Sequence, residues 1–243
     1  MKEKLKNTEK RAVILAGGKG TRLRPYTIVL PKPLMPIGDY PILEVIIRQL
    51  AFYGFNRITI AVNHQADLIK TFFADGSKWG VKIDYSLENK PLSTMAPLKL
   101  IDDLPDDFLV MNGDVLTDLN YREFYEAHVG TGSIFTISSY QREVKSEFGV
   151  LDINNDTLIG FQEKPIQKYD VSMGIYMVSK RAIDYIPKDT FYGFDHLMID
   201  LIKNKQSPKI KRFNGYWLDI GRPEDYENAT DVFQKQQNFF LKG

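Results

Sequence analysis

The feature that most constrains the fold is an uninterrupted apolar run, residues 12–16 (AVILA), that ends directly in glycines. Such a run, without polar alternation, is typical of a strand buried on both faces, as the central strands of parallel sheets are. Parallel strands need crossover connections, which are usually helices. The rest of the chain supplies them, because short β-branched runs alternate with longer amphipathic runs. The pattern therefore predicts an α/β fold.

The individual elements are predicted from the period of the apolar residues, which is about two in strands and about 3.6 in helices. The expected fold is a doubly wound, mostly parallel (Rossmann-like) mixed sheet with helices on both faces and a small antiparallel layer in the second half. No linker or repeat interrupts the chain, so we expect one domain over residues 1–243 with a tail at 1–10. The expected strands are 12–16, 57–62, 81–87, 107–111, 133–139, 150–153, 158–161 and 173–178; the expected helices are 41–53, 66–73, 121–127, 182–186, 194–203 and 224–240.

Composition excludes several classes of function. Lys and Arg number 32 against 31 Asp and Glu, and the net charge of +1 gives no reason to expect nucleic acid or a membrane surface as a partner. The absence of cysteine excludes disulfides, thiolate metal sites and cysteine nucleophiles, and it leaves oxygen-bound metals as the expected cofactor class. A cysteine-free chain whose first residues contain no apolar signal core is expected in the cytoplasm.

Residues 15–26 read LAGGKGTRLRPY, so a strand runs into three glycines within four positions. Glycines let the backbone approach a ligand and turn its amides toward phosphate oxygens, and Arg22 can hold a phosphate by two hydrogen bonds. The segment is not a P-loop, because Val13 stands where the upstream glycine belongs. It is not a dinucleotide fingerprint either, because Leu23 replaces the third glycine. The segment predicts a triphosphate-binding loop; the alternative is a tight turn without a ligand.

Lys32 is the second candidate residue because it stands between two prolines, in the sequence PKP. Proline fixes φ, so this turn presents one lysine from a backbone with little freedom. A fixed lysine close to a phosphate-binding loop can neutralise phosphate charge. The alternative is a turn that faces solvent.

The chain contains five segments in the order in which one enzyme family shows them: LAGGKGTRL followed by PKP, NGD at 112–114, FQEKP at 161–165, MGIY at 173–176 and WLDIG at 217–221. On these segments the chain resembles the sugar-1-phosphate nucleotidyltransferases, and its mannose-1-phosphate guanylyltransferase-like members in particular, along nearly its whole length. The resemblance implies an enzyme that joins a nucleoside triphosphate to a sugar 1-phosphate and releases pyrophosphate. It makes residues from about 11 to 115 the nucleotide-binding half and those from about 116 to 243 the sugar-phosphate-binding half.

The resemblance also implies which residues catalyse the reaction. Arg22, Lys32 and Asp114 are the expected catalytic residues, and Asp114 and Asp219 are expected to share a Mg²⁺ ion. This agrees with the preference of Mg²⁺ for one or two carboxylates together with phosphate oxygens and water. The residues that the resemblance places around the nucleotide are Leu15, Gly17, Gly18, Gly20, Thr21, Arg22, Glu88, Ser93, Asn112 and Gly113.

Three further residues are expected at the sugar phosphate. By the resemblance, Glu163 takes sugar hydroxyls, Lys164 takes the phosphate, and Gly174 lets the chain pass close to the sugar ring. As a bare pair, without the resemblance, Glu163 and Lys164 are more typical of a surface salt bridge.

Residues 91–98 read PLSTMAPL where the family has small residues beside the base and the sugar. Ser93 replaces a glycine, and Met95 to Pro97 replace small residues, so we expect a nucleotide pocket of different shape. Glu88 resembles the guanylyl-transferring members. The expected substrates are therefore GTP with mannose 1-phosphate or a related hexose or heptose 1-phosphate.

Two other functions stay open. One is a catalytically silent regulatory subunit that binds a nucleotide sugar, and the other is transfer to a non-sugar phosphate. The presence of all five candidate charges favours catalysis, and the EKP and MGIY segments favour a sugar. The family also suggests a homodimer. The five charged residues are Arg22, Lys32, Asp114, Lys164 and Asp219.

Overall fold

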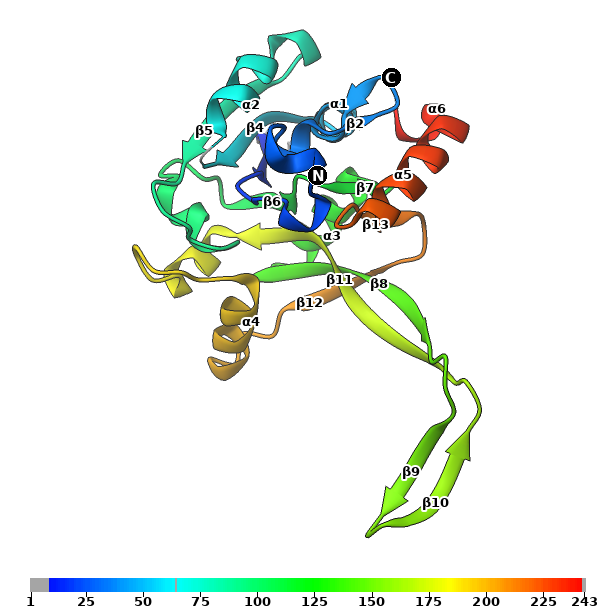
Figure 1. Cartoon of the computed structure of the whole chain (residues 1–243). Helices are drawn as coiled ribbons and strands as arrows, with labels where there is room; N and C mark the ends of the chain where they lie inside the picture. Colours follow the sequence, from blue (N-terminus) through cyan, green and yellow to red (C-terminus); the bar gives the residue numbers. More distant parts are fainter. Residues whose placement is uncertain (1–8, 64, 242–243) are drawn as a thin grey trace, which may run out of the picture.

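The computed structural model describes residues 9–63 and 65–241, and the predicted tail, apart from Glu9 and Lys10, lies outside them. A seven-stranded sheet in the order β12-β8-β11-β6-β1-β4-β5 forms the centre of the molecule (Figure 1). Every strand in it runs parallel to the others except β11. The prediction of a mostly parallel mixed sheet is confirmed. Its strands are β1 (Lys10–Leu15), β4 (Phe55–Val62), β5 (Lys82–Leu87), β6 (Asp107–Asn112), β8 (Phe135–Lys145), β11 (Ile166–Ser179) and β12 (Lys209–Phe213).

Apolar side chains cover both faces of the sheet, as the unbroken run in β1 predicts. Ala12 and Ile14 point into one buried cluster and Val13 into the other. Helices α1 (Ile42–Phe52), α2 (Ala66–Phe73), α3 (Tyr121–Thr131), α5 (Pro223–Lys235) and α6 (Gln237–Phe240) contribute to the first cluster, and α4 (Phe194–Lys203) contributes to the second.

Several elements differ from the sequence-based expectation. The expected helix 224–240 is interrupted at Gln236, whose φ of −134° and ψ of 34° are not helical, and the expected helix 182–186 is a 3-10 turn, Lys180–Tyr185. The edge strand β12 was not predicted, because its sequence KIKRF is polar and largely exposed, which is usual for an edge. Four very short strands were also not predicted: β2 (Pro36–Ile37), β3 (Tyr40–Pro41), β7 (Val115–Thr117) and β13 (Trp217–Asp219).

The largest difference is an arm that leaves the body of the molecule (Figure 1). Strands β8 and β11 are longer than expected, and residues 140–145 pair with 166–171 as an antiparallel ribbon. Beyond the ribbon, β9 (Val150–Asn154) and β10 (Thr157–Gln162) form a hairpin closed by Asn155 and Asp156, both with positive φ, as a type I′ turn requires. Of the antiparallel strands of the second half, β9 and β10 form the tip of the arm, and β8 and β11 run from the main sheet into the arm.

Candidate active site

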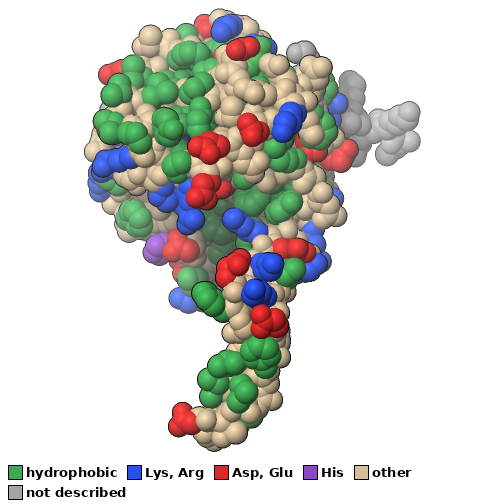
Figure 2. All heavy atoms as spheres, turned by 45° about the vertical axis from the view of Figure 1, so that its right-hand side comes forward, with side chains coloured by type: hydrophobic (Ala, Val, Ile, Leu, Met, Phe, Trp, Pro, Cys, Tyr) green, Lys and Arg blue, Asp and Glu red, His purple; other side chains and the backbone are tan. Residues whose placement is uncertain are grey.

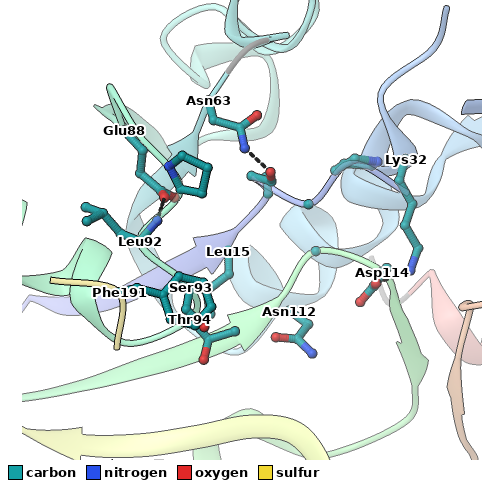
Figure 3. Close-up of a pocket in the computed structure, with 16 residues that line it drawn as sticks. Leu15, Lys32, Asn63, Glu88, Leu92, Ser93, Thr94, Asn112, Asp114 and Phe191 are labelled. Atoms are coloured by element: carbon teal, nitrogen blue, oxygen red, sulfur yellow. Dashed lines mark hydrogen bonds and ion pairs between the residues drawn. The ribbon is translucent and has the colours of Figure 1, made fainter. Parts of the chain in front are cut away.

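A pocket of about 330 Å³ opens at the carboxyl ends of β1, β4, β5 and β6 (Figure 3). Ligands of open α/β sheets bind at this edge. Nine residues predicted from the sequence line it: Leu15, Gly17, Gly18, Lys32, Glu88, Ser93, Asn112, Gly113 and Asp114. Seven lining residues were not predicted individually: Ala16, Pro33, Asn63, Pro91, Leu92, Thr94 and Phe191.

The glycine loop after β1 is required partly by packing. A Cβ at Gly17 would lie 3.0 Å from Oε1 of Glu88 and 3.1 Å from Nδ2 of Asn63, whose amide donates a hydrogen bond to the Gly17 carbonyl. Gly20 has a φ of 60°, and a Cβ there would lie 3.0 Å from Thr27. Gly18 has no such neighbour within 4 Å, so its backbone faces open space in the pocket. Packing thus accounts for Gly17 and Gly20, and Gly18 is open to a ligand.

Thr21 and Arg22 are exposed and lie outside the pocket lining, at the 3-10 turn Thr21–Leu23. Arg22 stands close to Asp219, because a Cβ at Gly221 would be 3.4 Å from both Nη2 of Arg22 and Oδ2 of Asp219. Its guanidinium therefore lies beside the expected metal carboxylate.

Lys32 is held rigidly, as its two prolines predict. It begins the 3-10 turn Lys32–Leu34, which is closed by hydrogen bonds from Leu34 N–H to Pro31 O (2.8 Å) and from Met35 N–H to Lys32 O (3.1 Å). The lysine is buried, and its Nζ forms an ion pair with Oδ2 of Asp114, 82 residues further along the chain. Figure 3 shows the two side chains pointing toward one another at the end of the pocket. The solvent-facing alternative for this lysine is wrong.

Asp114 and Asp219 lie together because β7 pairs with β13. Val115 is opposite Asp219, and Ile220 N–H donates to Asp114 O at 3.0 Å. The Oδ1 atom of Asp114 is buried and has no hydrogen-bond partner among the described residues. Burial, and then the charge of Asp114, raise the pKa of Asp219 above its ordinary value. Two close carboxylates, one of which keeps a buried oxygen without a partner among the described residues, fit a divalent cation.

A cation here would need ligands from outside the protein. Within residues 9–63 and 65–241, no group of three or more His, Asp or Glu side chains is placed to hold a metal ion. Asp114 and Asp219 could supply two oxygens, and Mg²⁺ usually completes its shell with phosphate oxygens and water.

Glu88 closes the other end of the pocket. Its Oε2 accepts a hydrogen bond from Leu92 N–H at 3.2 Å, and burial raises the pKa of its carboxyl group. The following loop is pinned to residues 192–194, since Tyr192 N–H donates to Leu92 O (3.0 Å) and Phe194 N–H donates to Thr94 Oγ1 (2.9 Å).

The structure corrects part of the expectation for residues 91–98. Ser93 lines the pocket with a φ of 71°, the left-handed conformation that favours the glycine it replaces. Met95 to Leu98, in contrast, are buried in the second core cluster and do not line the pocket. These apolar side chains therefore change the core and leave the pocket wall to Pro91, Leu92, Ser93 and Thr94.

Glu163 and Lys164 are not brought to this pocket. Both are exposed in the arm, where the ribbon meets the β9–β10 hairpin, and Lys164 has a φ of 44°. Gly174 does lie at the pocket's edge, since a Cβ there would be 2.6 Å from Nδ2 of the lining residue Asn112. The sugar-phosphate roles of Glu163 and Lys164 stay predictions.

Asn63 could have been found from its position, because it follows directly on β4, whose carboxyl end lies at the pocket. Phe191 and Thr94 carry no such signal, since they reach the pocket through loops whose path depends on tertiary packing.

Comparisons with known proteins agree with this geometry. The family model described as "Nucleotidyl transferase" matches residues 11–236. The chain is 34% identical over 240 residues to a UTP-glucose-1-phosphate uridylyltransferase of Synechocystis sp., and 33% identical over 233 residues to a mannose-1-phosphate guanyltransferase of Candida albicans. These alignments cover 90% and 92% of this chain but 62% and 64% of the relatives, so the chain spans a little less than two thirds of their length.

A similar solved structure is HddC from Yersinia pseudotuberculosis, with 31% identity, a TM-score of 0.72, and coverage of 92% of this chain and 99% of that one. HddC complexed with GMP-PN also matches, with a TM-score of 0.70. None of the helices in the described residues is long and apolar enough to cross a membrane. Since the family model matches nearly the whole described chain, the chain belongs to the nucleotidyl transferase family.

Proposed function

We propose that this protein transfers a nucleotidyl group from a nucleoside triphosphate to a sugar 1-phosphate, giving a nucleotide sugar and pyrophosphate. The observation that carries the proposal is the ion pair between Lys32 and Asp114 beside the glycine loop. A fixed cation and a carboxylate with an unused oxygen, next to backbone that can bind phosphates, provide the charge stabilisation that transfer at phosphorus requires. The names of the curated relatives support the same reaction class.

In this reaction an oxygen of the sugar phosphate attacks the α-phosphorus in line. A new P–O bond forms while the bond from the α-phosphorus to its bridging oxygen breaks, and pyrophosphate leaves with the electron pair. Gly17 and Gly18 bind phosphates through backbone amides, Lys32 neutralises the α-phosphate, and Arg22 holds the leaving pyrophosphate. Catalysis is then mainly positioning and charge stabilisation.

Asp114 and Asp219 are the residues that would hold Mg²⁺. The unpartnered Oδ1 of Asp114 and the raised pKa of Asp219 support this assignment, because both are expected where a cation is to bind between carboxylates. The ion, when bound, neutralises phosphate charge and orients the phosphate oxygens.

We further propose GTP as the donor, with mannose 1-phosphate or a related hexose or heptose 1-phosphate as the acceptor. Guanine offers an N1–H and an amino group to a carboxylate, whereas uracil and thymine present carbonyl oxygens on both sides of their single N3–H. The Oε2 atom of Glu88 accepts from Leu92 N–H, which leaves Oε1 for the base. The guanyltransferase relative and the GMP-PN complex of HddC support the same base.

The test is pyrophosphate release with each common nucleoside triphosphate crossed against hexose and heptose 1-phosphates and phosphocholine, with Mg²⁺ and with chelator. Metal-dependent release with GTP and mannose 1-phosphate supports the whole proposal. Release with another sugar keeps the reaction and corrects the substrate, and release with phosphocholine alone replaces the acceptor class. If no pair of substrates released pyrophosphate and calorimetry showed binding of a nucleotide sugar, the protein would be a catalytically silent subunit.

The Glu88→Gln variant tests the base assignment. Because glutamine has one acceptor oxygen, which cannot serve both Leu92 N–H and a donor of guanine, kcat/KM with GTP relative to UTP should fall by roughly tenfold or more. Glu123→Gln, on the exposed face of α3, is the control and should leave the ratio unchanged. An unchanged ratio in Glu88→Gln would remove Glu88 from base recognition.

A further inference from the structure

The arm exposes more apolar surface than a two-stranded ribbon can bury by itself. Leu151 pairs with Phe161 across the tip hairpin and Ile153 pairs with Leu158, so these four side chains share one face. They are 52%, 56%, 62% and 59% exposed, respectively. An isolated hairpin is marginally stable in water, and contiguous apolar patches on soluble proteins usually mark an interaction site. Figure 2 shows hydrophobic side chains gathered along the arm below the body.

The apolar area of the arm is a large part of what one side of a specific interface needs. Besides the four residues of the tip face, five large apolar side chains of the arm are about half exposed or more: Val144, Phe148, Ile159, Ile166 and Tyr169. Nine such side chains offer on the order of several hundred Å² of apolar surface. A standard protein interface buries about 800 Å² on each partner, so the arm alone supplies much of one side.

The extended ribbon holds Glu163 and Lys164 away from the pocket of their own chain. The ladder of β8 and β11 is continuous from Val171 to Ile166, and Ser146 N–H donates to Pro165 O at 3.0 Å beyond it. Six paired residues at about 3.3 Å each make the ribbon about 20 Å long. Glu163 and Lys164 lie beyond its far end, so the extended ribbon holds the pair about 20 Å from the residues at its base.

The body offers an open groove next to the pocket. Ile137, Val171, Phe194, Met198 and Ile210 give this groove of about 640 Å³ its apolar lining, and Asp170 and Arg212 stand at its rim, 3.1 Å apart. The groove and the pocket are lined by residues only three positions apart, since Phe191 lines the pocket and Phe194, the first residue of α4, lines the groove. A hairpin seated in the groove would therefore end close to the pocket.

A second copy of this chain is the occupant that fits best. Each copy carries both the apolar hairpin face and the apolar groove, so two copies can exchange arms around a two-fold axis and close the assembly. Three of the ribbon's charges are paired within the chain, Lys168 with Glu143 at 2.9 Å and Asp170 with Arg212 at 3.1 Å, and the net charge is only +1. Identical surfaces therefore meet without a large excess of like charge.

We propose that two copies of this chain exchange arms: the tip hairpin of one copy docks in the groove of the other, and its Glu163 and Lys164 complete that copy's substrate pocket by binding the sugar phosphate. The second part rests on the proposed function. The active site is then shared, with Lys32 and Asp114 from one copy and Glu163 and Lys164 from the other.

The test of sharing combines two defective chains. Asp114→Asn damages the body and Lys164→Ala damages the arm, and each variant alone should lose at least about 100-fold in turnover. The two are co-expressed with different tags and purified by both, so that every dimer contains one of each. In an exchanged dimer one of the two sites is intact, and turnover should return to about half of the wild-type value. Turnover no higher than that of the two variants alone overturns the exchange and leaves the proposed function standing. Normal turnover in Lys164→Ala alone overturns the role of that residue.

Assembly is measured independently of activity. Analytical ultracentrifugation should find the wild type at twice the 28.0 kDa chain mass, and Leu151→Glu should return it to 28.0 kDa with an unchanged circular dichroism spectrum. The matched control is Leu68→Glu on α2, a leucine 48% exposed outside the arm, which should stay dimeric. A wild type that is monomeric at micromolar concentration overturns the exchange, whether or not the protein is active.

Discussion

Two clusters of charge lie at opposite ends of the central strands, and they differ in how fully their charges are compensated. At the amino ends, the Arg11 side chain is 3% exposed and donates to Thr59 Oγ1 (3.0 Å) and Asp103 Oδ1 (2.7 Å), while Arg57 donates to Asp84 (2.7 Å). The hydrogen bonds from Arg11, and then Arg57, lower the pKa of Asp103 to about 2.

At the carboxyl ends the charges are left incompletely compensated. Lys32 has Asp114 as its ion-pair partner, Oδ1 of Asp114 is buried without a partner among the described residues, and Asp219 has a raised pKa. The comparison teaches that buried charge alone does not mark a functional site. A cluster whose positive and negative side chains pair with one another serves stability. A cluster that keeps a buried oxygen without a partner and a carboxyl group of raised pKa is available to a charged ligand.

The largest effect expected from this difference is at Lys32. Lys32→Met should lower turnover by about 10³-fold, because it removes the fixed cation next to the reacting phosphate. Its free energy of unfolding should fall by no more than about 2 kcal/mol, because Asp114 loses its partner while the burial cost of the lysine is relieved. That is well below the roughly 4 kcal/mol to which a 10³-fold loss of turnover corresponds. Pyrophosphate release and urea denaturation measure the two quantities. If the loss of unfolding free energy were as large as the activation free energy that corresponds to the lost turnover, Lys32 would be a structural residue and not a catalytic one.

A smaller effect on turnover is expected from a change at the proposed Mg²⁺ site. Asp219→Asn removes one negative charge from the proposed Mg²⁺ site, so the Mg²⁺ concentration that gives half-maximal turnover should rise by about 30-fold. Titrating turnover with MgCl₂ measures this shift. The same requirement for Mg²⁺ in variant and wild type would mean that Asp219 is not a ligand.

Arg11 should show the reverse behaviour. Arg11→Met removes the buried cation of this cluster and should cost about 2 kcal/mol of unfolding free energy. The cost is less than for a fully buried pair because Asp103 is 57% exposed and both carboxylates keep Arg57 as a partner. Turnover per folded molecule should stay within about twofold. Lys82→Met, an exposed member of the same cluster 3.7 Å from Asp84, is the control and should cost less than about 0.5 kcal/mol. A large loss of turnover in Arg11→Met would contradict the assignment of stability to the charge cluster at the amino ends of the strands and of function to the cluster at their carboxyl ends.

The smallest effect is a pH dependence. The folded pKa of Asp103 lies below its ordinary value of 3.8, so the stability it contributes is present above about pH 4 and is lost as the pH falls toward 2. Asp103→Asn should therefore be less stable than the wild type at pH 7, by under about 1 kcal/mol for so exposed a group, and equally stable near pH 2. Thermal unfolding across this range measures the difference, and a gap that widens in acid would contradict the sign.

Much of the body could be predicted from the sequence because its signals are local. The run 12–16 predicted a doubly covered strand, α4 was predicted with its observed bounds, and PKP predicted a rigid lysine. The approach of Lys32 to Asp114 was expected only through the family, because nothing local in the sequence relates residues 82 positions apart.

The arm could not be predicted for a different reason. Residues 140–145 and 166–171 are polar or mixed and carry no clear alternation, so the lengths of β8 and β11 depend on pairing with each other. The FQEKP segment was expected beside the pocket, and the structure places it beyond the ribbon. Sequence patterns report which residues recur together; they do not fix which copy of a chain brings them together.

The close approach of Gly174 to Asn112 has a consequence for which substitutions can arise at these two positions. Gly174 has a φ of 73°, and any side chain there would enter the space of Asn112, which lines the pocket. A lineage that enlarged position 174 would have to move or shrink the side chain at position 112, and the pocket would change with it. Positions 174 and 112 are therefore expected to covary among descendants of this chain. Such covariation would mark where β11 passes the edge of the sheet at which the pocket lies.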